Sequence, residues 1–201
     1  MDKVKIAVLV SGGGTNLQAI LDAQTSGALH SGEVRLVISN RPDAYALQRA
    51  EKAGVPTRMV VRGAQGSRET FEAGLLAALE EFDIQLIVLA GFMAILSGDF
   101  TARYEKRILN VHPSLIPAFC GEGYYGLRVH QAALEKGVKV TGATVHFVNE
   151  VPDGGEIIAQ KAVAVHPGDT PERLQKRVMR QAEWKILPAA IESVAAGMCS
   201  E

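Results

Sequence analysis

The segment KVKIAVLVSGGGTNLQAIL, residues 3–21, decides the fold class of this chain. It begins with a short run of aliphatic residues, Lys3–Val10, which predicts a buried strand. Three glycines follow, and Leu17–Leu21 then has the composition of a helix. A strand that turns through glycines into a helix is the first unit of a βαβ arrangement, and it therefore predicts an α/β protein.

Further strands and helices alternate along the first half of the chain. Strands are predicted at residues 34–39, 57–61, 86–90 and 108–111, and helices at 44–53 and 67–81. The run 86–90 is apolar throughout, as expected for a strand that helices cover on both faces. This order predicts a doubly wound, mostly parallel sheet of the Rossmann-like α/β class.

The pattern changes after His112. A glycine- and tyrosine-rich loop, residues 117–126, leads into a predicted helix over 127–136. Two β-rich runs, 139–149 and 156–165, follow it. Their connection is short, so we expect a C-terminal antiparallel hairpin added to the sheet.

Two helix starts carry clear signals. Ser67 is expected to cap the helix that ends near Glu81, because its hydroxyl can accept a hydrogen bond from the first turn. Thr170 and Pro171 are expected to be the N-cap and first helical position of the last helix. Pro188 lies inside that helix and is expected to kink or interrupt it.

Composition restricts the class of protein. The 201 residues suit one domain, and hydrophobic and charged contents of 47% and 21% are ordinary for a globular chain in water. A formal net charge of −1 argues against nucleic acid as a main partner, and the longest apolar run, 86–96, is too short to cross a membrane. Cys120 and Cys199 lack metal-ligand spacing, which argues against a zinc site and a disulfide framework. The sequence therefore predicts a cytoplasmic protein that needs no metal, membrane or nucleic acid.

The glycines after the first strand are a candidate phosphate site. Gly12–Gly14 would let an anion approach free backbone N–H groups at a helix N-terminus, where Thr15 and Asn16 can add side-chain donors. The segment is not a dinucleotide fingerprint, which needs glycine where Leu17 stands, and no Gly-Lys-Ser/Thr follows as in a P-loop. A monophosphate ester is the simplest ligand, and a tight turn with a good cap is the alternative.

Asn110 and His112 are candidate catalytic residues. They lie two positions apart at the end of a predicted strand, so their side chains share a face, and Pro113 ends the ladder directly after them. An amide donor beside an imidazole can stabilise a developing oxyanion while protons are moved. A histidine that is merely hydrogen-bonded at a strand end is the alternative.

Asp153 is a candidate partner for His112. Ligands of open parallel sheets bind beyond the carboxyl ends of the strands, where the glycine loop, Gly91–Met93 and His112 all fall. Asp153 lies in the predicted hairpin connection, and a carboxylate there would raise the pKa of His112 and fix its tautomer. The alternative is an ordinary turn aspartate. No chemistry is assigned to the other histidines, which are His30, His130, His146 and His166.

With these residues in view, the chain resembles the phosphoribosylglycinamide formyltransferase family, the folate-dependent enzymes of purine synthesis. The resemblance covers essentially the whole length and rests on VLVSGGGTNLQAI, ISNRPDAYAL, LAGFM, ILNVHPSLIPAF, VTGATVHFVNE and PDGGEIIAQ, in the family's order. It implies transfer of the formyl group of 10-formyltetrahydrofolate, the co-substrate, to the amine of glycinamide ribonucleotide. No metal is implied.

The resemblance also implies roles for residues. The family's catalytic triad falls on Asn110, His112 and Asp153. The positions implied to bind the nucleotide are Gly12, Gly13, Gly14, Thr15, Asn16 and, at the ribose, Glu183. The positions implied to bind the folate are Arg68, Phe92, Met93, Ala94, Ile95, Leu96, Asn110, Ala143, Thr144 and Asn149.

Two features depart from the family's pattern. Some members carry arginine after the Phe-Met pair, where this chain has Ala94. We therefore expect one contact to the folate glutamate tail to be absent, and Arg68 to serve that tail. The loop Cys120–Gly126 is longer than in many relatives, so its contribution to the site is left unassigned.

The implied reaction suits these side chains. Attack of an amine on a formyl carbon forms a tetrahedral centre with a negative oxygen and a positive nitrogen. Asn110 can donate to that oxygen, and protonated His112 can add charge stabilisation. Asp153 would hold the imidazolium and help a water relay to carry the amine proton to the leaving folate nitrogen.

Three other functions compete with this interpretation. Methionyl-tRNA formyltransferase usually adds a C-terminal domain and a basic surface, and the 10-formyltetrahydrofolate hydrolase usually adds an N-terminal regulatory domain. A non-catalytic phosphate sensor would use the glycine loop alone. Length and charge favour one formyltransferase domain over residues 1–201, with a nucleotide-binding N-terminal half and a folate-binding C-terminal half. We expect it to act on small molecules as a monomer or homodimer.

Overall fold

The computed structural model describes residues 2–63 and 66–199. Its strands form a seven-stranded sheet in the order β3-β2-β1-β4-β5-β6-β7. They are β1 (Val4–Val10), β2 (Gly32–Ser39), β3 (Thr57–Met59), β4 (Leu86–Leu89), β5 (Ile108–His112), β6 (Val140–Phe147) and β7 (Ile157–Ala164). The pairings among β1 to β5 are parallel, whereas β5–β6 and β6–β7 are antiparallel. The predicted fold class is confirmed, and β6 and β7 form the predicted hairpin.

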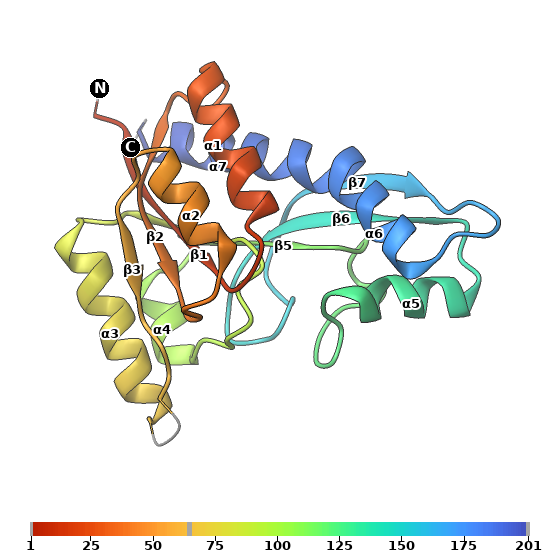
Figure 1. Cartoon of the computed structure of the whole chain (residues 1–201), viewed down its shortest axis with the longest axis horizontal. Helices are drawn as coiled ribbons and strands as arrows, with labels where there is room; N and C mark the ends of the chain where they lie inside the picture. The colour runs from red at the N-terminus through yellow and green to blue at the C-terminus, as the bar shows by residue number, and fades with distance from the viewer. Residues whose placement is uncertain (1, 64–65, 200–201) are drawn as a thin grey trace.

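Helices cover both faces of the sheet. They are α1 (Thr15–Ser26), α2 (Tyr45–Lys52), α3 (Arg68–Glu81), α4 (Gly98–Arg103), α5 (Leu127–Lys136), α6 (Pro171–Val178) and α7 (Trp184–Met198), with a π-helical turn η1 (Met179–Glu183) between the last two. Figure 1 shows α1, α2 and α7 together and α3 and α4 on the other side of the strands. Among the described residues, no helix is both long enough and apolar enough to cross a membrane.

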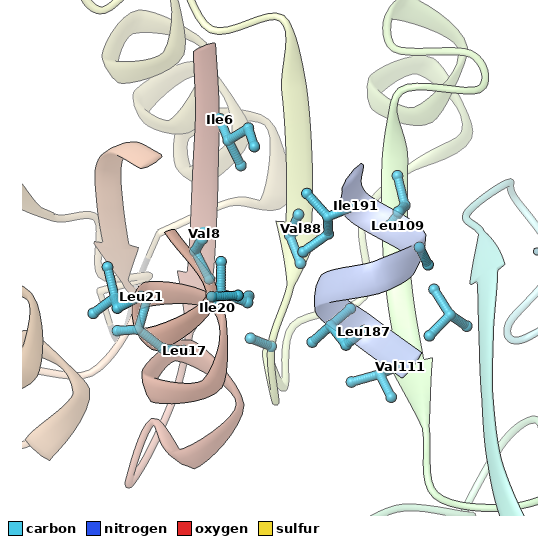
Figure 2. Close-up of a cluster of buried hydrophobic side chains, with 14 of the residues drawn as sticks. Ile6, Val8, Leu17, Ile20, Leu21, Val88, Leu109, Val111, Leu187 and Ile191 are labelled. Carbon is cyan, nitrogen blue, oxygen red and sulfur yellow. The ribbon is translucent and has the colours of Figure 1, made fainter. Parts of the chain in front are cut away.

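Alternation along the buried strands sends side chains into two apolar layers. Ile6 and Val8 of β1 belong to the layer under α1 and α7 (Figure 2), whereas Ala7 and Leu9 belong to the layer under α3 and α4. A strand covered on both faces needs apolar side chains at every position, which is why residues 6–10 are apolar without interruption. This packing holds the carboxyl ends of the parallel strands in fixed positions.

The predicted helix starts are confirmed. An interruption at Pro188 is wrong, whereas the kink predicted as its alternative stays a prediction. The Ser67 hydroxyl accepts from Thr70 N–H at 3.2 Å, and the Thr170 hydroxyl accepts from Arg173 N–H at 3.3 Å. Helix α7 continues through Pro188, and the irregularity lies upstream in η1. A proline ring clashes with the carbonyl four residues earlier, here at the point where the wider π turn gives way to α7. The short helix α4, which begins after Ser97, was not predicted.

Candidate active site

Asn110, His112 and Asp153 come together, as the sequence predicted. His112 Nδ1 lies 3.3 Å from Asp153 Oδ2, and Asn110 Nδ2 lies 3.5 Å from Asp153 Oδ1. The first two residues stand on β5, and the third lies in the connection between β6 and β7. All three line a cavity of about 740 Å³ at the ends of the parallel strands.

The connection between β6 and β7 is bent so that its carboxylate points at β5. Asp153 has a φ of 55°, in the left-handed region that aspartate tolerates better than most residues. A Cβ at Gly155 would collide with the carbonyl of Phe147, and one at Gly154 would lie 2.7 Å from the Val151 side chain. The two positions after Asp153 must therefore be glycine, because the chain approaches itself too closely there for a Cβ atom.

His146 belongs to the same cluster, although the sequence interpretation gave it no role. Its Nε2 lies 3.2 Å from Asn110 Nδ2 and 3.5 Å from Asp153 Oδ1, and its Nδ1 lies 2.7 Å from the Phe147 carbonyl. Only an Nδ1–H can bond that carbonyl, so neutral His146 accepts from the Asn110 amide at Nε2. The antiparallel register pairs Asn110 with His146 directly, and this register was the missing signal. His146 thus orients the amide.

The electrostatics favour a neutral histidine beside an ionised carboxylate. Burial holds the pKa of His112 below its usual value, although the Asp153 carboxylate and the Phe119 carbonyl pull it upward. Burial acts in the opposite sense on Asp153, but the neighbouring His146 and His112 rings and the hydrogen bond from Gly121 N–H outweigh it and lower the pKa of that carboxyl. The predicted upward influence of Asp153 on the pKa of His112 is present, but burial outweighs it and the net shift is downward. A neutral ring can accept a proton, and the carboxylate can then hold the resulting cation.

The loop 117–126 contacts the reactive groups themselves. The carbonyl of Phe119 lies 2.8 Å from His112 Nε2, and Gly121 N–H donates to Asp153 Oδ2 at 2.9 Å. Tyr124 on the same loop lines the main cavity. Burial and the nearby Asp153 charge raise the pKa of the Cys120 thiol, which keeps it protonated and makes it a poor nucleophile. The loop is thus one wall of the site.

The glycine loop lies where the sequence predicted, at the start of α1. Gly14 is the N-cap with a φ of 71°, and a Cβ there would lie 2.6 Å from that of Ala46 on α2. A Cβ on Gly12 or Gly13 would meet no atom within 4 Å, so this stretch of backbone is open to a ligand. Thr15 lines a separate cavity of about 170 Å³ between α1 and α2, away from the catalytic cluster.

Asn16 and Glu183 form the wall between the glycine loop and the catalytic cluster. Asn16 Nδ2 donates to Glu183 Oε2 at 2.7 Å, and both residues line the main cavity. Asn16 Oδ1 is buried and has no partner among the described residues. Burial raises the pKa of Glu183 to about 6. A buried acceptor and a poorly solvated carboxyl are well suited to hydroxyl groups of a ligand.

Most of the predicted folate residues lie at the other end of the cavity. Phe92, Ala94 and Ile95 line both the main cavity and an adjoining one of about 140 Å³, which Leu96 and Asn149 also line. A third cavity of about 440 Å³ is lined by Met93, Ala94, Ile95, Arg62 and Arg68.

Ala143 and Thr144 do not line any of these three cavities. Ala143 is fully buried in the apolar layer under α7. The Thr144 hydroxyl donates to the Ser114 carbonyl at 2.7 Å and accepts from Ile116 N–H at 3.1 Å. Thr144 therefore anchors the start of the loop that faces His112.

The sequence interpretation missed several cavity residues. His130 on α5 is fully buried against the main cavity, and its ring nitrogens have no partner among the described residues. Burial lowers the pKa of His130 to about 4. Gln175 and Met179 line the cavity from α6 and η1. Within residues 2–63 and 66–199, no group of three or more His, Cys, Asp or Glu side chains is arranged to hold a metal ion.

The fold and site together define a class of protein: an α/β enzyme with a glycine loop and an amide–imidazole–carboxylate cluster at the strand ends. The formyl transferase family model matches residues 4–191. The chain belongs to the formyl transferase family. The resemblance to phosphoribosylglycinamide formyltransferases that the sequence suggested is confirmed.

Individual relatives agree with this assignment. Phosphoribosylglycinamide formyltransferase of Escherichia coli is 42% identical, over 96% of this chain and 88% of its own length. Glycinamide ribonucleotide transformylase 1 of Symbiobacterium toebii superposes with a TM-score of 0.90 at 46% identity, covering 97% of this chain and 89% of that one. The trifunctional purine biosynthetic protein adenosine-3 of Gallus gallus is 48% identical over 98% of this chain, which spans only 19% of that longer protein.

Proposed function

We propose that this chain transfers the formyl group of 10-formyltetrahydrofolate to the amine of glycinamide ribonucleotide, a step of de novo purine biosynthesis. The observation that carries the proposal is the position of the catalytic cluster in the cavity. Asn110 and Asp153 line the main cavity together with Asn16 and Glu183, and they also line the adjoining small cavity with Asn149. A formyl group that passes from the folate to the nucleotide would therefore meet Asn110 and Asp153.

The nucleotide fits the end of the cavity next to α1. Its phosphate would bind the open N–H groups of Gly12–Asn16, which combine close backbone approach with a helix N-terminus. Its ribose hydroxyls would meet Glu183 and the unpartnered Asn16 Oδ1. This placement directs the glycinamide amine toward His112.

The folate fits the end next to β4 and the β6–β7 connection. The small cavity between Leu96 and Asn149 suits a flat pterin ring, and the exposed side chains of Met93 and Ile95 supply an apolar path away from it. The path leads to the third cavity, where Arg68 can pair with the carboxylates of the glutamate tail.

The reaction follows from the protonation states of the cluster. The amine nitrogen attacks the formyl carbon, and the carbonyl electron pair moves to oxygen, where the Asn110 amide donates to it. Neutral His112 accepts the proton of the attacking nitrogen, and Asp153 stabilises the imidazolium. The bond from carbon to the folate nitrogen then breaks, and that nitrogen takes up the proton. Because Nε2 of neutral His112 donates its proton to the Phe119 carbonyl, Nε2 must first leave that carbonyl, and the ring proton must move to Nδ1 beside Asp153, before Nε2 can accept the amine proton.

We further propose that residues 1–201 act as one domain, as a monomer or homodimer in the cytoplasm, on small molecules alone. The near-neutral net charge of −1 supports the absence of nucleic acid from the reaction.

The test is an ultraviolet assay of 10-formyltetrahydrofolate deformylation with and without glycinamide ribonucleotide. Deformylation that depends on the nucleotide, with formation of formylglycinamide ribonucleotide by mass spectrometry, is the expected result. Deformylation at the same rate without the nucleotide would show a hydrolase instead, and transfer only to methionyl-tRNA would show the other transferase.

A further inference from the structure

Ser11 lies between the glycine loop and the Met93 segment, directly after β1. It follows β1 directly, begins the glycine loop and is only 5% exposed. Its hydroxyl donates to Asn40 Oδ1 at 2.6 Å and accepts from the backbone N–H of Met93 at 2.8 Å. One side chain therefore joins the ends of β1, β2 and β4, which lie side by side in the sheet.

The Met93 bond fixes a segment that the sheet does not hold. The ladder between β1 and β4 ends with the bond from Ala90 N–H to the Leu9 carbonyl, and Gly91 then turns away with a φ of 74°. Within residues 91–96, the backbone N–H of Met93 donates a hydrogen bond, and its acceptor is the Ser11 hydroxyl. The Met93 side chain is 55% exposed and lines the main and third cavities.

The Asn40 bond extends the same connection to the cavity assigned to the glutamate tail. Asn40 follows β2 and lines that third cavity with Arg62 and Arg68. Its turn is braced by Ser39, whose hydroxyl bonds the carbonyl and the N–H of Arg41. Ser11 thus links the phosphate loop to two walls of the folate path through a single buried hydroxyl.

We propose that Ser11 is a positioning residue that couples the two substrate sites, so that the nucleotide on the glycine loop orders the Met93 segment for the folate. The proposal rests on the proposed function. A phosphate bound to Gly12–Asn16 restrains the backbone on one side of Ser11, and the hydroxyl passes this restraint to Met93 N–H. Binding of one substrate then lowers the ordering cost of the other, by the same factor in both directions.

The test measures the Kd of tetrahydrofolate, which has no formyl group to transfer, by calorimetry with and without saturating glycinamide ribonucleotide. The wild-type protein should bind the folate about fivefold or more tighter with the nucleotide, within the range usual for coupled sites. In Ser11→Ala this ratio should fall to about one, while each ligand alone still binds. Ser11→Thr, which keeps the hydroxyl, should retain at least part of the ratio if its melt shows a folded protein.

Thr101→Val is the matched control, because it removes an equally buried hydroxyl that bonds the Gly98 carbonyl within helix α4. It should lower the melting temperature and leave the ratio unchanged. A wild-type ratio of one, an unchanged ratio in Ser11→Ala, or an equal loss in Thr101→Val would each overturn the coupling. Failure of the wild-type protein to bind either ligand alone would overturn the proposed function as well, which separates the two failures.

Discussion

The parallel part of the sheet, β1–β4, and the part with antiparallel pairing, β5–β7, contribute to the cavity in different ways. In the parallel part, each functional segment follows its own strand in sequence, as Gly12–Asn16 follows β1 and Phe92–Leu96 follows β4. In the antiparallel part, the neighbours in space are distant in sequence, as when Asn110 meets His146 and Asp153. The first part offers backbone N–H groups and apolar edges, which suit binding. The second offers ionisable side chains held against one another, which suits chemistry.

This difference predicts that substitutions in the antiparallel part act on kcat and those in the parallel part on KM. The largest expected effect is that of His112→Ala, which should lower kcat at least about a hundredfold, as for loss of a positioned acid–base group. Single-turnover assays at saturating substrates would measure it. Retention of more than about a tenth of wild-type turnover, well outside that range, would remove His112 from the chemistry.

Asp153→Asn tests whether the carboxylate acts through the imidazole. Its charge raises the pKa of His112 against the effect of burial, so its removal should lower that pKa further. At low pH, kcat falls because His112 is already protonated and cannot accept the amine proton. This acidic limb of the kcat profile should then move to lower pH. We expect kcat at pH 7 to fall about fiftyfold, which is less than for loss of the acid–base group itself, because Asp153 acts through His112. An unmoved profile with normal turnover would make Asp153 an ordinary turn residue.

Glu183 connects the two parts, because it lies on η1 against β6 and β7 and accepts a hydrogen bond from Asn16 of the glycine loop. Its burial should destabilise the folded protein at neutral pH. Its folded pKa of about 6 lies above the ordinary 4.5, so folding favours the protonated form. Stability should therefore rise as the pH falls through 6, and ionisation above that value should cost about 2 kcal/mol. Glu183→Gln removes this cost and keeps an acceptor for Asn16. Urea unfolding should show the variant more stable by about 2 kcal/mol at pH 8 and without gain below pH 4.5.

If Glu183→Gln raised the free energy of unfolding equally at both pH values, packing and not ionisation would account for its stability. The same variant should bind the nucleotide more weakly, since a neutral amide is a poorer acceptor for ribose hydroxyls.

The smallest expected effect is that of Gly13→Val in the parallel part. The nucleotide KM should rise about tenfold, the equivalent of about 1.4 kcal/mol, because the side chain would block anion approach to the backbone. The folate KM should stay the same. The fold should be intact, since a Cβ at this position meets no atom within 4 Å. Gly14→Ala is the contrast, because its Cβ would lie 2.6 Å from Ala46 and should destabilise the protein.

The same comparison explains what could be predicted from the sequence. Strand-to-loop signals are local, so the glycine loop, the Ser67 and Thr170 caps and helix α5 lie where they were predicted. Asn110 and His112 could be paired because the period of a strand is also local. The position of His146 could not be predicted, because it depends on the register between β5 and β6. Burial likewise decides the pKa of His112, and no short stretch of sequence reports it.

The π-helical turn η1 changes the direction in which side chains point before and after it, within one continuous helical segment. Each residue of a regular helix advances it by about 100°, so deleting one residue from Met179–Glu183 would rotate α6 against α7 by that amount. Gln175 could not then face the cavity while Leu187 and Ile191 remain in the apolar core. The extra residue lets one segment serve a ligand cavity at one end and a hydrophobic core at the other. A designer who regularised this helix would gain ideal geometry and lose a wall of the binding site.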